Sequence, residues 1–205
     1  GKLKPDLEMI IQIASKFEVS PISIVARSID KSKYTNQIFE LPISEYEKII
    51  NKEVEPLRKR IAAKKIDELS AIQLHAIYQL RSEVFVVEQN CAYQDIDDID
   101  LVALHLQFFM DKKLVAYCRI IAPNLNSPHA QIGRVVVSSK HRKTGLGKQL
   151  MNQAIKKTLQ IYPNQIIHIS AQTYLLKFYR ELGFKDTGET YLEDGIPHVG
   201  MNYVG

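Results

Sequence analysis

The sequence predicts an α/β protein, in which segments with strand and helix patterns alternate along most of the chain. Three observations support this class: a strand–loop–helix unit at residues 133–159, a β-hairpin at residues 104–121, and a strand, a helix and a second hairpin at residues 166–201. In the expected helices apolar residues recur three to five positions apart, whereas the expected strands are short apolar runs bounded by polar turns.

Composition and charge exclude several classes of protein. The chain has 205 residues, of which 45% are hydrophobic, and a formal net charge of +4, which does not demand a nucleic acid partner. The two cysteines, Cys91 and Cys118, fit no metal-ligand spacing and no disulfide framework. No apolar run has the length of a membrane span, and no signal peptide is visible. We therefore expect a cytoplasmic protein with no metal and no membrane partner.

Residues 1–60 are expected to form a helical extension of unknown role. Residues 5–30 contain two helical patterns joined by a tight turn similar to a helix-turn-helix. The second pattern offers only Arg27 and Lys31 to phosphates, so a helical hairpin that packs on the main domain or on a partner is favoured over DNA binding. A charged helix at residues 44–60 follows, and we place the domain boundary at its end.

From residue 61 the elements follow in order. A short first strand is expected at residues 61–69, and an amphipathic helix begins at Ser70. The hairpin at residues 104–121 turns at residues 111–113. The last helix, residues 173–182, is expected to end at a glycine C-cap, Gly183, before the final hairpin.

The strand before Ser138 carries an arginine among apolar residues. Strict alternation places Ile132, Arg134 and Val136 on one face of this strand, and Val135 and Val137 on the other. Because a buried arginine needs an anionic partner, we expect a carboxylate near Arg134.

The basic turn that follows this strand predicts an anion site. Gly145 and Gly147 allow the backbone to approach a ligand closely, and the first amides of the following helix have no partner within it. Arg142, Lys143 and Lys148 add full positive charges. The resulting anion site suits a phosphate or pyrophosphate, although the turn matches neither the Walker A motif nor the GxGxxG fingerprint.

Four separated motifs carry a resemblance to a known family. Residues 142–147, Arg-Lys-Thr-Gly-Leu-Gly, match the Gln/Arg-x-x-Gly-x-Gly/Ala signature of the GNAT acyltransferases, and residues 178–184 resemble the C-terminal helix and turn of that superfamily. Residues 81–93, and residues 193–198 followed by Met201, are similar to its ElaA-like branch. The resemblance covers residues 61–205 and leaves residues 1–60 unassigned.

The resemblance implies a mixed α/β sheet, the GNAT acyl-CoA N-acyltransferase fold, which opens between its fourth and fifth strands to bind acetyl-CoA. The backbones of Val135 and Val137 would bind the pantetheine arm, and an amide near Val136 would face the thioester carbonyl. The pyrophosphate would be held by Arg142, Lys143, Thr144, Gly145, Leu146, Gly147 and Lys148. Gln172 stands where many members have a cofactor-contacting asparagine.

Acetyl transfer to an amine needs a neutral nucleophile, a polarised carbonyl and a proton for the departing thiolate. By resemblance, Tyr179 is the general acid that supplies this proton; the alternative is a core tyrosine. The sequence leaves the general base open among Glu88, His105, His198 and a water chain. Glu88 follows an apolar run, so we expect burial to raise its pKa.

An acidic loop between residues 95 and 100 suggests how a substrate is bound. Asp95 and Asp97 would attract a cationic amine, and Arg134 and His198 are further candidates for substrate contact. A solvated acidic loop is the alternative. Its spacing resembles a calcium loop, but the glycine and terminal glutamate of an EF-hand are absent.

The leading hypothesis is an acetyl-CoA-dependent N-acetyltransferase whose acceptor is a primary amine. The alternative is an acyl-CoA-responsive regulator whose N-terminal helices bind DNA or a protein partner. Polyamine-like molecules, aminosugars and protein amines all remain open as acceptors. Apolar strands near the end of this fold often pair between subunits in the family, which leaves a homodimer open.

Overall fold

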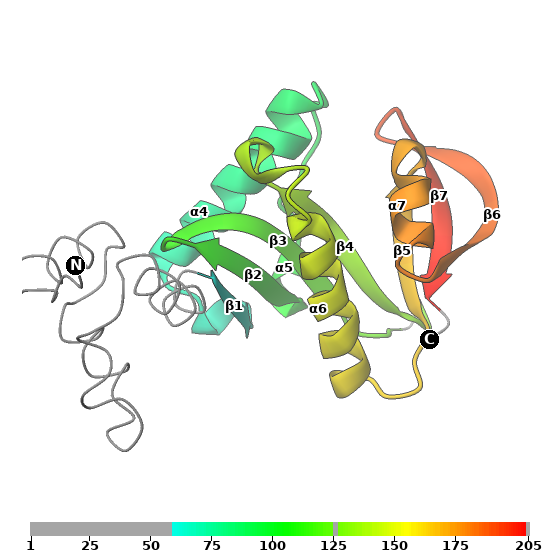
Figure 1. Cartoon of the computed structure of the whole chain (residues 1–205), viewed down its shortest axis with the longest axis horizontal. Helices are drawn as coiled ribbons and strands as arrows, with labels where there is room; N and C mark the ends of the chain where they lie inside the picture. The colour runs from blue at the N-terminus through cyan, green and yellow to red at the C-terminus, as the bar shows by residue number, and fades with distance from the viewer. Residues whose placement is uncertain (1–58, 125–126, 204–205) are drawn as a thin grey trace, which may run out of the picture. The chain divides into compact units, whose positions relative to one another are not determined.

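The computed structural model describes residues 59–124 and 127–203 (Figure 1). Most of these residues belong to the larger of two compact units, which comprises residues 61–109 and 113–205. The helices expected before residue 59 lie outside the described residues, and the domain boundary at residue 60 stays a prediction.

The core of the fold is a mixed sheet of seven strands in the order β1-β2-β3-β4-β5-β7-β6. β4 and β5 are parallel, whereas the pairs β3–β4, β5–β7 and β6–β7 are antiparallel. The bounds are β1 (Lys59–Lys64), β2 (Leu104–Met110), β3 (Lys113–Ile121), β4 (Ala130–Val137), β5 (Ile167–Gln172), β6 (Phe184–Glu193) and β7 (Ile196–Tyr203). The predicted fold class and both hairpins are confirmed.

Helices cover both faces of the sheet. They are α4 (Ala71–Arg81), the π-helical η3 (Ser82–Glu88), α5 (Ile99–Val102), α6 (Leu146–Ile161) and α7 (Leu176–Arg180), with short 3-10 turns η2 (Ile66–Glu68), η4 (Ser139–His141) and η5 (Thr173–Leu175). α4 begins where predicted because Ser70 caps it: its side chain accepts from the amide of Gln73, and the Gln73 side chain accepts from the amide of Ser70. The last helix is shorter than predicted, and Gly183 (φ +96°) follows it in the left-handed conformation that favours glycine.

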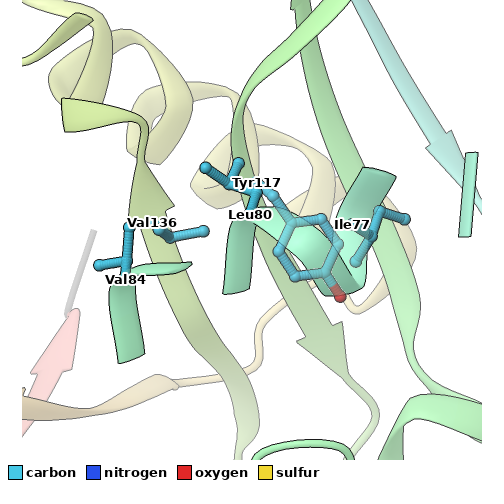
Figure 2. Packing of buried hydrophobic residues seen from close by; sticks show 5 residues of the cluster. All are labelled: Ile77, Leu80, Val84, Tyr117 and Val136. Atoms are coloured by element: carbon cyan, nitrogen blue, oxygen red, sulfur yellow. The ribbon is translucent and has the colours of Figure 1, made fainter. Parts of the chain in front are cut away.

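The helix α4 packs on one face of the sheet through a small apolar cluster. Ile77, Leu80 and Val84 contact Tyr117 of β3 and Val136 of β4, and all five are at least 94% buried (Figure 2). Burial of each large apolar side chain contributes roughly 1.5–3 kcal/mol. The cluster therefore fixes α4 and the start of η3 against the middle of β3 and the end of β4.

The helix α6 packs on the other face. A Cβ atom at Gly147, in the first turn of α6, would lie 3.7 Å from Val137 Cγ2. Since Val137 follows Val136 in β4, its side chain points away from α4. The two helices therefore cover opposite faces of β4.

The sheet opens between β4 and β5, as the resemblance implies. Within the described ranges these strands share only two residue pairs, Ala130–Ile167 and Gln131–His168. β4 continues to Val137 and β5 to Gln172, and the two strands diverge after the shared pairs (Figure 1). The backbone groups along both edges of this opening are available to a ligand.

A β-bulge interrupts β4 next to the opening. Tyr117 pairs with Val136 but Arg119 pairs with Gly133, so β4 holds one residue more than β3 over this step. Arg134 lies in the bulge with φ +52°, in the left-handed region. The extra residue makes the alternation prediction wrong: Ile132 pairs with Ile120, whose side chain points to the face opposite that of Tyr117, so Ile132 and Val136 do not share a face.

Candidate active site

The glycine-containing turn lies at the end of β4 and leads into α6. The Arg142 Nε donates to the Val137 carbonyl (3.2 Å), and the Thr144 hydroxyl donates to the His141 carbonyl (2.7 Å), so the turn is held by its own contacts. Gly145 is the N-cap of α6 with φ +80°, and a Cβ atom there would have nothing within 4 Å. The space in front of the first α6 amides is open, which suits an anion.

The start of α6 lies between the two sides of the opening. A Cβ atom at Gly147 would lie 3.6 Å from the ring of Phe178 in α7 and 3.7 Å from Val137 in β4. The neighbouring Leu146 is buried, whereas Lys143 and Lys148 are exposed, and Lys148 Nζ lies 3.3 Å from Glu181. The first α6 amides and two exposed lysines therefore lie at the end of the sheet opening.

Arg142 is paired with Glu88. The Arg142 Nη1 and Nη2 atoms lie 2.5 and 2.8 Å from the Glu88 Oε1 and Oε2 atoms. The side chains are 39% and 43% exposed, and the hydrogen bond from Arg142 holds the pKa of Glu88 below its ordinary value. The expectation that burial raises this pKa is wrong, and Glu88 faces the glycine-containing turn of residues 142–148, which we call the anion loop.

The end of β4 directs main-chain groups into the opening. The Ser138 amide donates to the Val115 carbonyl of β3 (2.9 Å), so strand alternation turns the amides of Val137 and Val135 away from β3. Val135 lies in the bulge beside Arg134 and Val137 lies after it, and both are in the part of β4 that β5 does not pair. These are the two residues whose backbones the resemblance assigns to the pantetheine arm.

Tyr179 of α7 is a buried phenol. It is 5% exposed, and its ring contacts Phe178 and Phe184 edge-on at centroid distances of 5.0 and 5.9 Å. Burial raises its pKa well above the ordinary value, and the nearby thiol of Cys118 adds to the same effect. The phenol is therefore protonated at neutral pH and has a proton to donate.

His105 is fully buried in β2, away from solvent. Its Nε2 lies 2.8 Å from the Asp100 carbonyl and its Nδ1 lies 2.8 Å from the Tyr117 hydroxyl. Because a carbonyl only accepts, Nε2 carries the hydrogen and Nδ1 accepts from Tyr117. Burial also lowers the pKa of His105. Both ring nitrogens are occupied, so the structure does not favour His105 as the base.

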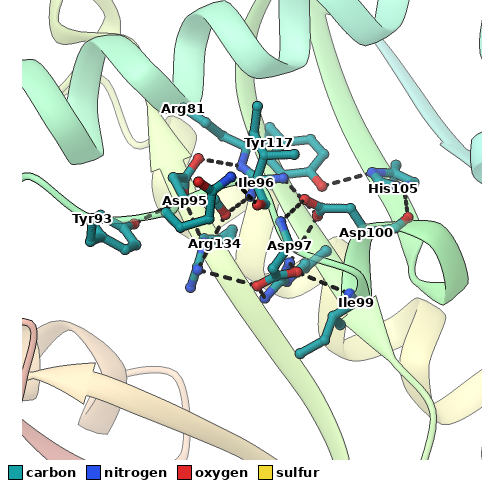
Figure 3. A network of polar contacts seen from close by, with 12 residues as sticks. Arg81, Tyr93, Asp95, Ile96, Asp97, Ile99, Asp100, His105, Tyr117 and Arg134 are labelled. Carbon is teal, nitrogen blue, oxygen red and sulfur yellow. Dashed lines mark hydrogen bonds and ion pairs between the residues drawn. The ribbon is translucent and has the colours of Figure 1, made fainter.

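Three arginines and three aspartates form a largely buried network beside β4 (Figure 3), in which Arg134 and Asp97 are partly exposed. Its short contacts are Arg81 Nε–Asp95 (3.0 Å), Arg81 Nη1–Asp100 (2.7 Å), Arg119 Nη1–Asp97 (2.5 Å), Arg119 Nη1–Asp100 (2.8 Å) and Arg134 Nε–Asp95 (2.8 Å). Burial alone would raise the pKa of Asp100, but hydrogen bonds from Arg81 and Arg119 outweigh it and hold that pKa below its ordinary value. The formal charges of the six side chains cancel.

The network corrects the interpretation of the acidic loop. Asp95 and Asp97 bind arginines of the same chain, so they are not free to attract a cationic amine, and Asp95 is not a solvated residue. The carboxylate partner expected for Arg134 is present. Sequence reasoning missed Arg119, although a charged residue within the apolar run of β3 signalled a buried ion pair.

Gln172 and His198 lie on the β5 side of the opening. They are cross-strand partners on β5 and β7. The Gln172 and Gln89 side-chain amides lie 3.4 Å apart, which brings the end of η3 to the end of β5. His198 is buried, its Nδ1 lies 2.8 Å from the Ile196 carbonyl, and its ring stacks on Tyr191 at 6.2 Å.

No cluster of three or more histidine, cysteine, aspartate or glutamate side chains with metal-binding geometry occurs in residues 59–124 and 127–203. In the same described part of the chain, no helix combines the length and apolar character needed to span a membrane.

Comparisons with known proteins agree with this geometry. A family model described as "Acetyltransferase (GNAT) domain" matches residues 68–204. The chain therefore belongs to the GNAT family of acyltransferases. Within that family it is similar to protein ElaA of Escherichia coli K12, with 44% identity over 136 residues, which are 65% of this chain and 89% of ElaA. A UPF0039 protein of Schizosaccharomyces pombe is 44% identical over 140 residues, which are 67% of this chain and 92% of that protein.

Comparisons with solved structures support the same family. An acyl-CoA N-acyltransferase from Pseudomonas aeruginosa matches with a TM-score of 0.67 and 41% identity, over 71% of this chain and 99% of that one. The crystal structure of Escherichia coli ElaA matches with a TM-score of 0.67 and 40% identity over the same shares. The predicted ElaA-like membership and GNAT fold are confirmed.

Proposed function

We propose that this chain is an acetyl-CoA-dependent N-acetyltransferase that transfers an acetyl group to a primary amine by direct attack in a ternary complex. The observation that carries the proposal is the opening between β4 and β5, with the anion loop at its end. Membership of the GNAT family supports acyl transfer, and the choice of acetyl group and amine is our inference from the site.

Different residues around the opening bind different parts of acetyl-CoA. The first α6 amides, with Arg142, Lys143 and Lys148, hold the pyrophosphate. The backbone groups of Val135 and Val137 bind the pantetheine arm as an added strand would, because β5 leaves this edge of β4 unpaired. Bound acetyl-CoA supplies the activated carbonyl on which the chemistry takes place.

Two groups of this chain stabilise the reaction. An amide of the bulged segment, next to Val136, donates to the carbonyl oxygen as it gains negative charge. Tyr179, held protonated by burial, donates its proton to the sulfur as the carbon–sulfur bond breaks. Both donors are fixed by packing, so little reorganisation is needed during the reaction.

Titration calorimetry of the full chain with acetyl-CoA, followed by an amine screen that measures CoA release, tests the proposal. Tyr179→Phe removes only the hydroxyl and keeps the ring between Phe178 and Phe184. We expect it to bind acetyl-CoA as the parent does and to lose about 10²–10⁴-fold in kcat, the usual contribution of a general acid.

The control for this experiment is Tyr162→Phe, a half-buried tyrosine next to the end of α6, outside the proposed site. Unchanged kcat in Tyr179→Phe would remove the acid role. A folded parent that does not bind acetyl-CoA would remove the proposed function.

A further inference from the structure

Three polar side chains converge on one face of the C-terminal part of the sheet. Tyr191 and Glu193 are two residues apart on β6, so they share a face, and both reach across β7 to Ser170 on β5. The Tyr191 hydroxyl lies 2.6 Å from Ser170 Oγ, and Ser170 Oγ lies 2.7 Å from Glu193 Oε2. Ser170, Tyr191 and Glu193 are exposed.

The direction of these hydrogen bonds follows from the proton count. An ionised carboxylate only accepts, so the single hydroxyl proton of Ser170 is donated to Glu193. The Ser170 oxygen must then accept from the Tyr191 hydroxyl. The result is a directed chain, Tyr191 to Ser170 to Glu193, that ends on a carboxylate at the surface. We call these three residues the tyrosine–serine–glutamate chain.

The tyrosine–serine–glutamate chain lies on the side of β5 that faces the end of η3. Gln172 is two residues after Ser170, on the same face, and its side chain contacts Gln89 just after η3. The Cys91 thiol lies 3.3 Å from the Asp194 carbonyl in the β6–β7 turn, next to Glu193. Residues 89–91 therefore contact the same part of the molecule at two points.

By residue count, the tyrosine–serine–glutamate chain also lies level with the bulge of β4. Counting along the parallel strands from the Gln131–His168 pair, Ser170 is as far along β5 as Gly133 is along β4, next to the bulge at Arg134. The amide proposed to polarise the thioester carbonyl lies in the same stretch of β4. The tyrosine–serine–glutamate chain thus lies on the β5 side of the opening, level by residue count with the bulge of β4.

Other titratable groups around this place have hydrogen-bond partners of their own, although His168 and His198 are bound through one ring nitrogen each and His198 stacks on Tyr191. Glu88 is bound to Arg142, and both nitrogens of His105 are occupied. His168 Nδ1 lies 2.8 Å from Asn202 Oδ1, and His198 Nδ1 lies 2.8 Å from the Ile196 carbonyl. Only the tyrosine–serine–glutamate chain, among these groups, joins the acceptor side of β5 to a solvent-exposed carboxylate.

We propose that the tyrosine–serine–glutamate chain removes a proton from the acceptor, which arrives as a protonated primary amine. The ammonium gives one proton to the Tyr191 oxygen, the Tyr191 proton passes to Ser170, and the Ser170 proton passes to Glu193. The amine becomes neutral, the Glu193 carboxylate becomes a carboxylic acid, and it returns the proton to water. This inference rests on the proposed N-acetyltransferase function and names its proton acceptor.

The test uses Glu193→Gln in the full chain. Glutamine keeps an oxygen that can accept from Ser170, but it cannot hold the transferred proton. The matched control is Asp194→Asn, which removes one charge at the next residue, where no described contact uses the side chain. Acetyl-CoA and three amines, namely spermidine, glucosamine and a peptide with a free N-terminus, serve as probes, and CoA release is measured from pH 6 to pH 10.

We expect at least one amine to accelerate CoA release. For that amine, Glu193→Gln should lower kcat/KM by about 10–100-fold near pH 7, at or below the usual contribution of a general base because water can replace part of the route. The deficit should shrink as the pH rises through the pKa of the amine, about 8 for an α-amino group and about 10 for an alkyl amine, because more of the amine is then already neutral. Ser170→Ala should give a similar loss, and the double variant should lose no more than either single one.

Each of the other possible outcomes would reject one part of the proposal. Equal rates in Glu193→Gln and Asp194→Asn, or a deficit that does not change with pH, would reject the proton route. Acetyl-CoA binding without acceleration by any amine would reject the amine acceptor and leave the acyl-CoA site standing. Absence of acetyl-CoA binding would instead reject the proposed function itself.

Discussion

The two sides of the sheet opening are stabilised in different ways. On the β4 side, polar side chains are buried and joined by ion pairs, as in the contacts of Arg81 and Arg119 with Asp100. On the β5 side, Ser170, Tyr191 and Glu193 are joined by hydrogen bonds at the surface. Water does not compete for the buried contacts, so the β4 side holds a fixed geometry, whereas groups that exchange protons need access to water.

The buried network also explains how an unfavourable backbone conformation persists. Arg134 adopts a positive φ, which costs a residue with a Cβ atom free energy, and its guanidinium is held by Asp95 and Asp97. The same loop carries Asp100, which binds Arg81 of α4 and Arg119 of β3. The acidic loop therefore joins α4, β3 and the bulge, and it supports the amides next to the bulge.

Among the changes that test this difference between the two sides, Asp100→Ala is expected to have the largest effect on the free energy of unfolding. The variant leaves Arg81 and Arg119 buried without the carboxylate that they share, and loss of one partner of a buried ion pair costs about 3–5 kcal/mol of unfolding free energy. Urea unfolding followed by circular dichroism measures it. Asp98→Ala is the control, since Asp98 is exposed in the same loop, and it should change the unfolding free energy by about 0.5 kcal/mol or less.

Similar losses in the two variants would mean that the total charge of the loop matters, and not the buried contacts. The comparison between a buried β4 side and a solvated β5 side would then have no energetic basis.

A second, smaller effect on the free energy of unfolding is expected when the pH is lowered. The pKa values of Asp97 and Asp100 lie below their ordinary values in the folded protein, because hydrogen bonds from arginines outweigh the effect of burial. Their contribution to stability is therefore complete above the unfolded-state pKa of about 4, and it is lost as the pH falls through the lower folded-state values. Urea unfolding between pH 7 and pH 3 should show a decline in unfolding free energy that is smaller in Asp100→Ala than in the parent.

The sequence predicted those features that depend on neighbouring residues. The order of the strands after residue 61, the start of a helix at Ser70 and the glycine turn before α6 all follow from local patterns. The resemblance added the opening between β4 and β5. In each case a few consecutive residues carry the information.

The features that sequence reasoning missed depend on contacts between distant residues or on one inserted residue. The pairing of Glu88 with Arg142 joins positions 54 residues apart, and no periodicity signals it. The bulge at Arg134 shifts the faces of β4, which strict alternation cannot predict. His105 looked like a candidate base until both of its nitrogens were placed in the core.

The smallest expected effect concerns the contact between Glu88 and Arg142, where the β4 side meets solvent. Glu88 occupies the guanidinium that we propose for the pyrophosphate, so a bound phosphate has to compete with it. Exposed ion pairs contribute about 0–1 kcal/mol, and Glu88→Gln is therefore expected to tighten acetyl-CoA binding by up to about 5-fold at low salt. Asp98→Asn, which removes the same charge at an exposed aspartate of the acidic loop, is the control in calorimetry. Weaker binding in Glu88→Gln would show that the glutamate holds Arg142 in a productive position, and the anion loop would then depend on η3 for its geometry as β4 depends on the buried network.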